Sequence, residues 1–203
     1  MGRKPVNKIR KLNPQYREKY VRKLLPVFQQ YGINHYTMEE LTEIIGISKA
    51  TFYQYFTSKE EMISVVLKHI LSNIRAFEPV LGDNSLTFKE RYFNALRILS
   101  ENVSGISDIM LSDLREGYPQ HWNLVEQFTE YSTEILKNFY DAGISAGEFH
   151  ALNSKLLALS DQIFINTISD PQQLKKLGMS LGEALNAHFR IKCYGLLPES
   201  PED

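Results

Sequence analysis

The chain has 203 residues, of which 43% are hydrophobic and 23% are charged. This composition is ordinary for a globular protein and argues against wholesale disorder, and no apolar run is long enough to predict a membrane-spanning helix. The net charge of −1 hides an asymmetry: residues 1–75 carry 13 basic and 6 acidic side chains (+7), whereas residues 76–203 carry 10 and 18 (−8). Such a split favours an anionic partner for the N-terminal part only.

The chain opens with a basic arm, residues 1–13, and its pattern is helical from Pro14 onward. Leu24 and Phe28 recur at helical spacing. Pro26 is expected to bend or break this first helix, because proline removes a backbone hydrogen bond. Further helices are predicted at residues 38–45, 49–56 and 59–77.

Capping boxes mark the starts of two of these helices, at Thr37 with Glu40 and at Ser58 with Glu61. A Ser or Thr at the N-cap and a Glu three residues later satisfy free amide groups reciprocally. In the second half we predict a linker at 79–85 and helices at 88–102, 107–115, 122–140, 152–169 and 172–194. The helix at 152–169 is apolar almost all round, so we expect it to be buried on most sides.

Residues 37–56, TMEELTEIIGISKATFYQYF, have the layout of a helix-turn-helix. Leu41 and Ile45 supply the inner face of the first helix, and Gly46 permits the turn. Phe52 and Phe56 hold the second helix down. The outer positions suit DNA, since Lys, Thr, Tyr and Gln reach phosphates or base edges and a small alanine allows close approach. They are Lys49, Ala50, Thr51, Tyr53 and Gln54.

This stretch, and SKATFYQYFTSKEEM above all, resembles the TetR/AcrR family of bacterial transcriptional regulators over roughly residues 16–67. The positions that follow the family pattern are Phe28, Gly32, Thr37, Gly46, Ser48, Tyr53, Phe56 and Lys59. Three positions depart from it: Thr42 and Ile45 stand where small alanines are usual, and Pro26 interrupts the first helix.

The resemblance implies that Thr37, Tyr53 and Lys59 contact phosphates. It places Lys49, Ala50, Thr51 and Gln54 in the major groove. The helix that begins at Ser48 aims free backbone amides at a phosphate as well.

The expected fold is therefore all-α, with an N-terminal three-helix helix-turn-helix domain followed by a C-terminal helical bundle for ligand binding and dimerisation. We expect a flexible basic arm at 1–13, a DNA-binding domain with its connecting helix at 14–77, and the bundle at 78–203. The last two helices are the candidate homodimer interface. Pairing would present two recognition helices to a pseudo-palindromic double-stranded operator.

A small-molecule effector is expected between facing helices of the bundle. Candidate pocket residues are mostly aromatic or apolar, which indicates an apolar or amphipathic effector. Asp161 is included because it interrupts an apolar helix and a buried carboxylate needs a partner. The candidates are Met110, Tyr118, His121, Trp122, Phe128, Tyr131, Asp161 and Phe164.

Candidates for catalysis are weak. The G-x-S-x-G patterns at 143–147 and 178–182 lie in a predicted turn and inside a predicted helix, whereas a nucleophile elbow needs a strand before it. The five histidines form no metal-binding spacing, and Cys193 is alone. We therefore predict no enzyme, cofactor or metal, and a cytoplasmic location.

The predicted function is a ligand-responsive repressor. Two alternatives stay open: a DNA-binding protein without a small-molecule inducer, and an all-α enzyme whose helix-turn-helix is vestigial.

Overall fold

The computed structural model describes residues 14–197, so the predicted basic arm and the last six residues lie outside the described part. The described residues form helices and connecting loops and contain no strand, which confirms the all-α prediction. In chain order the helices are α1 Pro14–Tyr31, α2 Met38–Ile45, α3 Lys49–Tyr55, α4 Lys59–Ile74, the 3-10 turn η1 Arg75–Phe77, α5 Glu78–Leu81, α6 Phe88–Val103, α7 Asp108–Gly117, α8 Pro119–Ser145, α9 Ser154–Ile168, α10 Pro171–Leu177 and α11 Leu181–Leu196.

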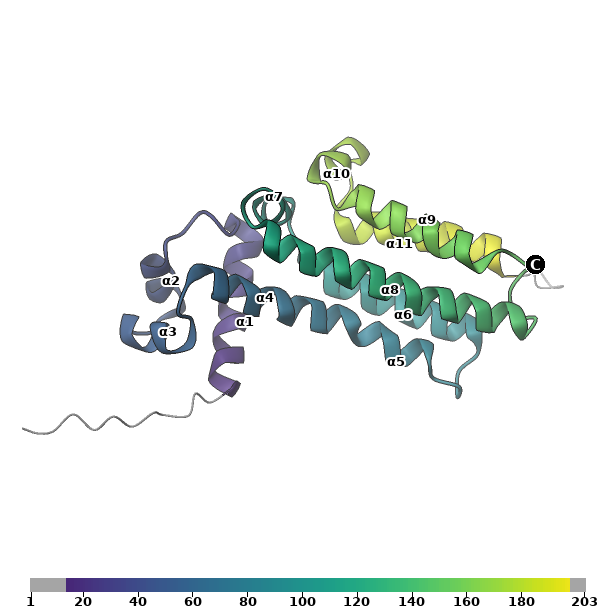
Figure 1. Cartoon of the computed structure of the whole chain (residues 1–203), viewed down its shortest axis with the longest axis horizontal. Helices are drawn as coiled ribbons and strands as arrows, with labels where there is room; N and C mark the ends of the chain where they lie inside the picture. Colours follow the sequence, from purple (N-terminus) through teal and green to yellow (C-terminus); the bar gives the residue numbers. More distant parts are fainter. Residues whose placement is uncertain (1–13, 198–203) are drawn as a thin grey trace, which may run out of the picture.

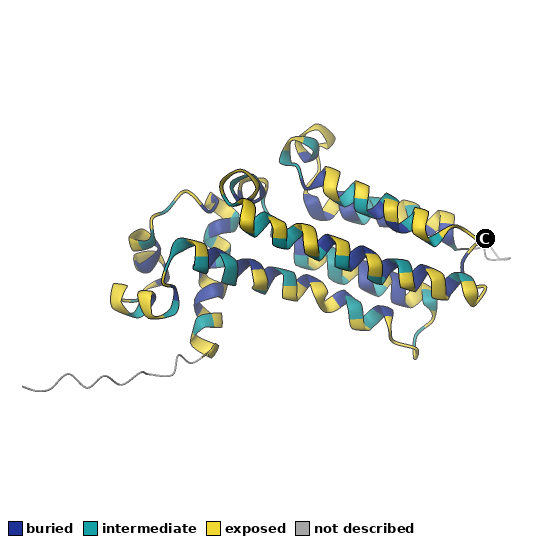
Figure 2. Cartoon of the chain, in the orientation of Figure 1, coloured by how far each residue is buried: buried dark blue, intermediate teal, exposed yellow. Residues whose placement is uncertain are grey.

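Helices α1 to α3 form a small unit at one end of an elongated molecule (Figure 1). α4 leads out of this unit into the body, where it packs against α6 and α8. α9 lies along α8, and α11 lies along α6, so the body is a layered helical bundle. Buried residues follow the inner faces of these helices from the small unit into the body (Figure 2).

The small unit is fixed by caps and by a compact aromatic core. Thr37 caps α2 in a complete capping box with Glu40. Gly46 ends α2 in the left-handed conformation (φ 70°) that glycine adopts without strain. Phe52 and Phe56 are fully buried, with their ring centroids 5.2 Å apart, so the angle between α2 and α3 is locked as predicted.

Helix α1 passes through Pro26 without a break, contrary to the expected interruption. Pro26 lies on the exposed side of the helix. There, water can satisfy the carbonyl that loses its amide partner, so the cost of the proline is limited.

The last predicted helix, 172–194, is two helices, α10 and α11. Gly178 has φ 63° and ends α10, and Ser180 opens α11 through a capping box with Glu183. The second G-x-S-x-G pattern therefore straddles a turn between helices and does not lie inside one. Two other boundaries also differ: α5 occupies the first part of the predicted linker, and α8 extends beyond both predicted ends.

Helix α9 is less buried within one chain than its apolar composition predicted. Leu156 is 64% exposed and Ile163 is 58% exposed. On α11, Ile191 and Tyr194 are 73% and 79% exposed. We call these four residues, with Leu152 and Leu159, the α9–α11 apolar surface.

Candidate nucleic-acid interface and interior cavity

Helix α3 presents one polar face to solvent because its opposite face is held in the core by Phe52. Ser48 begins the helix, and its hydroxyl accepts a hydrogen bond from the Thr51 amide at 3.1 Å. The exposed positions include four predicted contacts, and Thr51 is half-buried beside them. The four are Lys49, Ala50, Tyr53 and Gln54.

Glu39 of α2 is the partner of two of these side chains. Its carboxylate lies 2.8 Å from Lys49 Nζ and accepts a hydrogen bond from the Tyr53 hydroxyl at 3.3 Å. The bond to Lys49 lowers the pKa of Glu39 and raises that of Lys49. Exposed ion pairs contribute little free energy, so phosphate can replace Glu39 as the partner of Lys49 at small cost.

Thr37 and Lys59 hold neighbouring helix starts. The Thr37 hydroxyl donates to Glu40 at 2.8 Å, so it satisfies its own helix in this structure. Lys59 is half-buried, which lowers its pKa, and its amine donates to the Tyr36 carbonyl at 3.1 Å. Lys59 therefore ties the start of α4 to the segment before α2.

A second set of polar contacts joins the small unit to the body, and we call it the Asp113 latch. The Asp113 carboxylate of α7 accepts hydrogen bonds from the backbone amides of Ile33 and Asn34 at 2.6 and 3.0 Å. The Asn34 side-chain amide donates to the other carboxylate oxygen at 3.1 Å. The Tyr118 hydroxyl also donates to Asn34, at 2.8 Å. His121 adds a contact to the Glu60 carbonyl at 2.9 Å.

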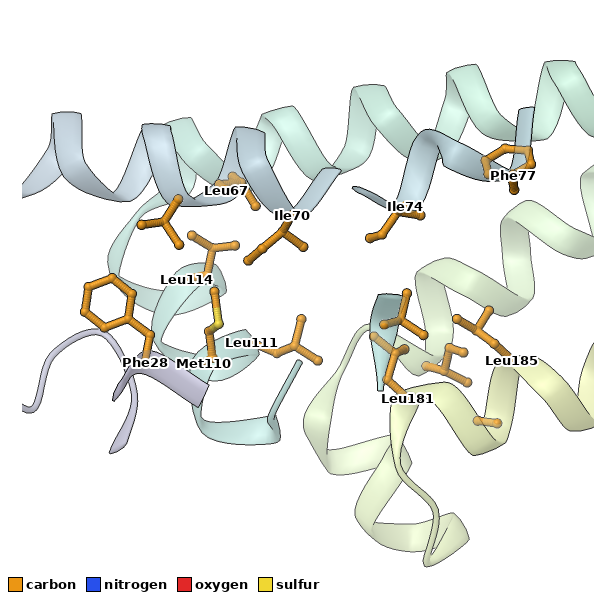
Figure 3. Close-up of a cluster of buried hydrophobic side chains, with 14 of the residues drawn as sticks. Phe28, Leu67, Ile70, Ile74, Phe77, Met110, Leu111, Leu114, Leu181 and Leu185 are labelled. Carbon is orange, nitrogen blue, oxygen red and sulfur yellow. The ribbon is translucent and has the colours of Figure 1, made fainter. Parts of the chain in front are cut away.

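The body contains an apolar cavity of about 120 Å³. Leu67, Ile70 and Ile74 of α4 form one wall, facing α7 (Figure 3). Leu181 and Leu185 of α11 close another side. The cavity lies directly behind the Asp113 latch, because Met110, Leu111 and Leu114 of α7 line it from the same helix.

Two of the eight predicted pocket residues, Met110 and Phe128, line this cavity. Tyr118 and His121 belong to the interface with the small unit instead. Trp122 donates to Glu126, at 3.1 Å, and Tyr131 packs under the Arg75 guanidinium. Asp161 and Phe164 also lie outside the lining: Phe164 stacks on His188 with ring centroids 4.0 Å apart.

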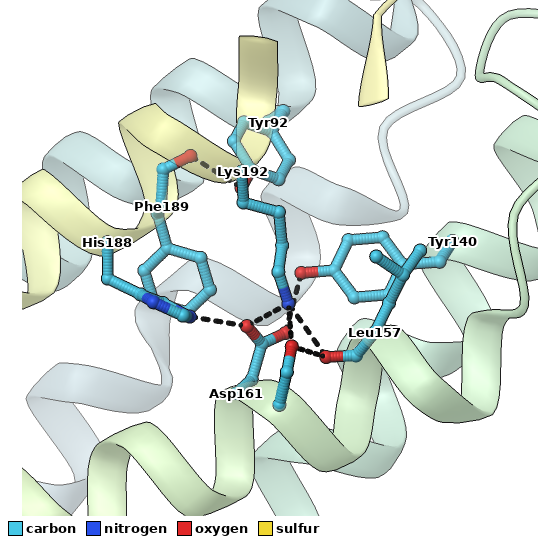
Figure 4. Close-up of polar contacts among 8 residues, drawn as sticks. Tyr92, Tyr140, Leu157, Asp161, His188, Phe189 and Lys192 are labelled. Carbon is cyan, nitrogen blue, oxygen red and sulfur yellow. Dashed lines mark hydrogen bonds and ion pairs between the residues drawn. The ribbon is translucent and has the colours of Figure 1, made fainter. Parts of the chain in front are cut away.

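Asp161 is fully buried at the centre of an internal charge network (Figure 4). It accepts hydrogen bonds from the Tyr140 hydroxyl at 2.7 Å and from Lys192, and it contacts His188 Nε2 at 2.8 Å. Burial raises the pKa of Tyr140 and lowers that of Lys192. The partner that sequence analysis required for Asp161 is thus supplied by helices α8 and α11.

Sequence reasoning missed most of the cavity lining and also Glu39 and Asp113. The lining comes from six helices, and helical periodicity shows which residues face inward but not which of them face a void. The sequence carries no signal that singles out Asp113, since α7 also holds Asp108, Arg115 and Glu116. The partners of Asp113 in α1's trailing loop are about 80 residues away in sequence.

A helix-turn-helix with an exposed second helix, joined by a connecting helix to an all-α body, defines a DNA-binding regulator fold. Residues 25–66 match the family model described as bacterial regulatory proteins of the tetR family. The resemblance found in the sequence is confirmed, and the chain is a TetR-family transcriptional regulator with a DNA-binding domain.

The chain is similar to an HTH-type transcriptional regulator of Bacillus subtilis, YvaF, with 21% identity over 178 residues, which cover 87% of this chain and 93% of that one. Two solved structures share the fold. They are the TetR-family regulator PfmR from Thermus thermophilus (TM-score 0.63, 19% identity, 87% and 98% coverage) and the ketosteroid transcriptional regulator KstR2 of Mycobacterium tuberculosis (0.61, 17%, 91% and 96%).

These relatives are transcription regulators, a class of protein that does not act by catalysis. In the described part of the chain, no helix combines the length and the apolar character needed to cross a bilayer.

Proposed function

We propose that the chain represses transcription as a homodimer on a pseudo-palindromic operator, and that a small molecule in the body releases it. In this proposal residues 14–77 read DNA and residues 78–203 bind the effector and the second subunit. The protein acts in the cytoplasm, where bacterial operators lie.

The polar face of α3 is the observation that carries DNA binding. Lys49, Tyr53 and Gln54 project from a short helix whose other side is anchored by a buried phenylalanine. Tyr53 is 39% exposed, so its ring and hydroxyl are accessible to a partner on this face. A helix of this kind fits the major groove, with phosphates reached from its flanks.

The α9–α11 apolar surface supports a second copy of the chain as the partner. Leu156, Ile163 and Ile191 are each more than half exposed on two helices that contact each other, and exposed apolar side chains gathered in this way are typical of an interface. A two-fold axis through this surface would place two α3 helices on one side of the dimer. Successive major grooves lie about 34 Å apart.

The Asp113 latch offers a route from effector to DNA. α7 contributes Leu111 and Leu114 to the cavity wall and Asp113 to the contact with α1's trailing loop. A ligand that shifts α7 therefore changes how the small unit sits on the body. The ligand alters operator affinity only by its differential affinity for the two arrangements.

DNA binding is tested by fluorescence anisotropy with the duplex upstream of the protein's own gene and with a random duplex of equal length. We expect Gln54→Ala to lose about 1–3 kcal/mol on the specific duplex and little on the random one. In this proposal Lys49 exchanges Glu39 for a phosphate at the edge of the major groove, so Lys49→Ala should weaken both duplexes and reduce the salt slope by about one. Arg97→Ala, an exposed arginine on α6 of the body, is the charge-matched control and should change neither.

Equal affinity of the native protein for both duplexes at every salt concentration would contradict sequence-specific binding.

Dimerisation is tested separately by analytical ultracentrifugation. Leu156→Asp should yield monomers and weaken operator binding. Leu177→Asp makes the same substitution at an exposed leucine of α10, outside the α9–α11 apolar surface, and should leave the dimer intact. If operator binding holds but no small molecule weakens it, the alternative of a regulator without an inducer is favoured.

A further inference from the structure

Within the part of the chain that the structure describes, one side-chain polar atom of the cavity lining has no hydrogen-bond partner. Among the lining residues, the Thr129 hydroxyl donates to the Val125 carbonyl at 3.0 Å, and the Ser169 hydroxyl donates to the Ile165 carbonyl at 2.8 Å. The Ser132 hydroxyl is buried and makes no hydrogen bond within the described residues. Ser132 is only 8% exposed, so solvent outside the protein does not satisfy it.

An unpaired buried hydroxyl is uncommon in folded proteins and lowers stability unless something bonds to it. Ser132 lies on α8 between Phe128 and Leu136, one turn away on either side, and both also line the cavity. The Ser132 hydroxyl therefore belongs to the cavity wall and is a polar group on a predominantly apolar surface.

The rest of the lining restricts the charge of any occupant. Apart from the three hydroxyl side chains it consists of aliphatic residues, methionine and phenylalanine, and it includes no charged side chain. A buried ion without a counter-ion carries a large desolvation penalty. The network of Asp161 and Lys192 offers no counter-ion, because neither residue lines the cavity.

We propose that the cavity binds a neutral, largely apolar small molecule that carries one hydroxyl or carbonyl group, and that Ser132 Oγ bonds to this group. The inference deepens the proposed function and rests on its effector site in the body. Ser132 then fixes the orientation of the molecule, and the apolar walls on α4, α7 and α11 supply most of its affinity.

The size of the cavity sets the probe. Its volume, about 120 Å³, is close to that of an engineered cavity of about 150 Å³ that binds benzene. A single ring with one substituent is therefore a suitable test molecule. Benzyl alcohol, toluene, benzoate and benzylammonium share this ring and differ only in what it carries: a hydroxyl, no polar group, a negative charge or a positive charge.

The experiment is calorimetric titration of the full chain, without DNA, with each of the four probes. We expect benzyl alcohol and toluene to bind, and benzoate and benzylammonium to bind at least about 100-fold more weakly, because their charge is not compensated. Ser132→Ala should weaken benzyl alcohol about fivefold, the equivalent of one net hydrogen bond, and leave toluene within about twofold.

Thr129→Val is the matched control, since it removes a hydroxyl from the same wall that is already bonded to Val125. It should leave the ratio of benzyl alcohol to toluene affinity unchanged. The proposal is overturned if either charged probe binds as tightly as benzyl alcohol, if none of the four binds, or if Ser132→Ala weakens alcohol and toluene equally. Operator binding is measured in a separate experiment. A protein that does not bind an operator would overturn the proposed function, but the relative affinities of the four probes would still test the cavity.

Discussion

Removal of Asp161 alone should destabilise the protein far more than removal of the whole charged pair. In Asp161→Ala, the Lys192 ammonium, whose side chain is 8% exposed, loses its counter-ion. The Tyr140 hydroxyl and His188 lose their acceptor at the same time. Removing one partner of a buried ion pair typically costs about 3–5 kcal/mol.

The lower end of this range applies here. Lys192 keeps the Leu157 carbonyl at 2.7 Å and the Ser160 hydroxyl at 2.9 Å, and burial already lowers its pKa, so it can shed its proton. We therefore expect a loss of about 3 kcal/mol, and about 2–4 °C of melting temperature per kcal/mol for a chain of this size. The predicted fall in melting temperature is about 6–12 °C.

Thermal unfolding followed by circular dichroism measures this fall, at one fixed protein concentration because association also raises the melting temperature. The double variant Asp161→Leu with Lys192→Met removes both charges and keeps apolar volume, so it should lie within about 2 kcal/mol of the native protein. If the single variant loses less than about 1 kcal/mol, or if the double variant is as unstable as the single one, the reasoning about an uncompensated buried charge is wrong.

Three further predictions concern the latch, the caps and one close contact. Asp113→Ala removes the acceptor of two backbone amides and should lower stability by about 1.5–3 kcal/mol in urea unfolding; unchanged stability would contradict the latch. Hydrogen bonds from Thr37 and Thr87 lower the pKa of Glu40 and Glu90 below the usual 4.5. The stability that these two carboxylates contribute is therefore fully present above pH 4.5, and it is lost as the pH falls through their lower folded-state pKa. The double variant Glu40→Gln with Glu90→Gln should therefore lose less stability than the native protein between about pH 5 and 3. Equal losses in the two proteins would contradict the role of these caps. Gly143→Ala would place a methyl group 2.2 Å from a Phe149 ring carbon and should cost about 1–3 kcal/mol by thermal unfolding.

Local signals in the sequence predicted the helix starts and the helix-turn-helix well. The capping box predicted at Thr37 opens α2. Ser58 caps α4 as predicted, but the Glu61 carboxylate accepts a hydrogen bond from the Thr57 amide and does not complete a capping box at Ser58. These motifs act through atoms within three residues of one another, so the chain outside them has little influence. Phe52 and Phe56 were likewise identified as anchors because their spacing on a short helix leaves only one face for the core.

The same kind of reasoning failed at the break between α10 and α11. Leu174, Leu177, Leu181 and Leu185 continue a leucine stripe at helical spacing, and this stripe favoured one helix. In the structure Leu177 is 54% exposed, so the stripe does not form a single face. The capping box at Ser180 was present in the sequence and should have outweighed the periodicity, because a cap fixes a backbone geometry and a leucine does not.

The pocket could not be predicted residue by residue, since its walls come from helices far apart in the chain. Aromatic residues at the start of α8 were expected to face a ligand. Tyr118 and His121 instead meet the small unit, at Asn34 and Glu60, since their rings carry polar atoms that suit a half-exposed boundary between two packed units. The part of α8 that lines the cavity lies further along the helix and includes Phe128, Ser132 and Leu136.

The basic charge of the N-terminal part includes two lysines near the predicted DNA-binding surface, and their partners in the structure differ. Lys49 and Lys59, the basic residues of the helix-turn-helix region, are both engaged without DNA: one with Glu39, the other with the Tyr36 carbonyl. Lys49 exchanges its partner readily, because the pair is exposed. Lys59 is half-buried and holds two helix starts together, so moving it onto a phosphate also loosens the packing of α4 against the segment before α2. We therefore expect Lys49→Ala to act on affinity alone, whereas Lys59→Ala should lower both operator affinity and the melting temperature. Loss of affinity with an unchanged melting temperature would show that Lys59 serves only the DNA.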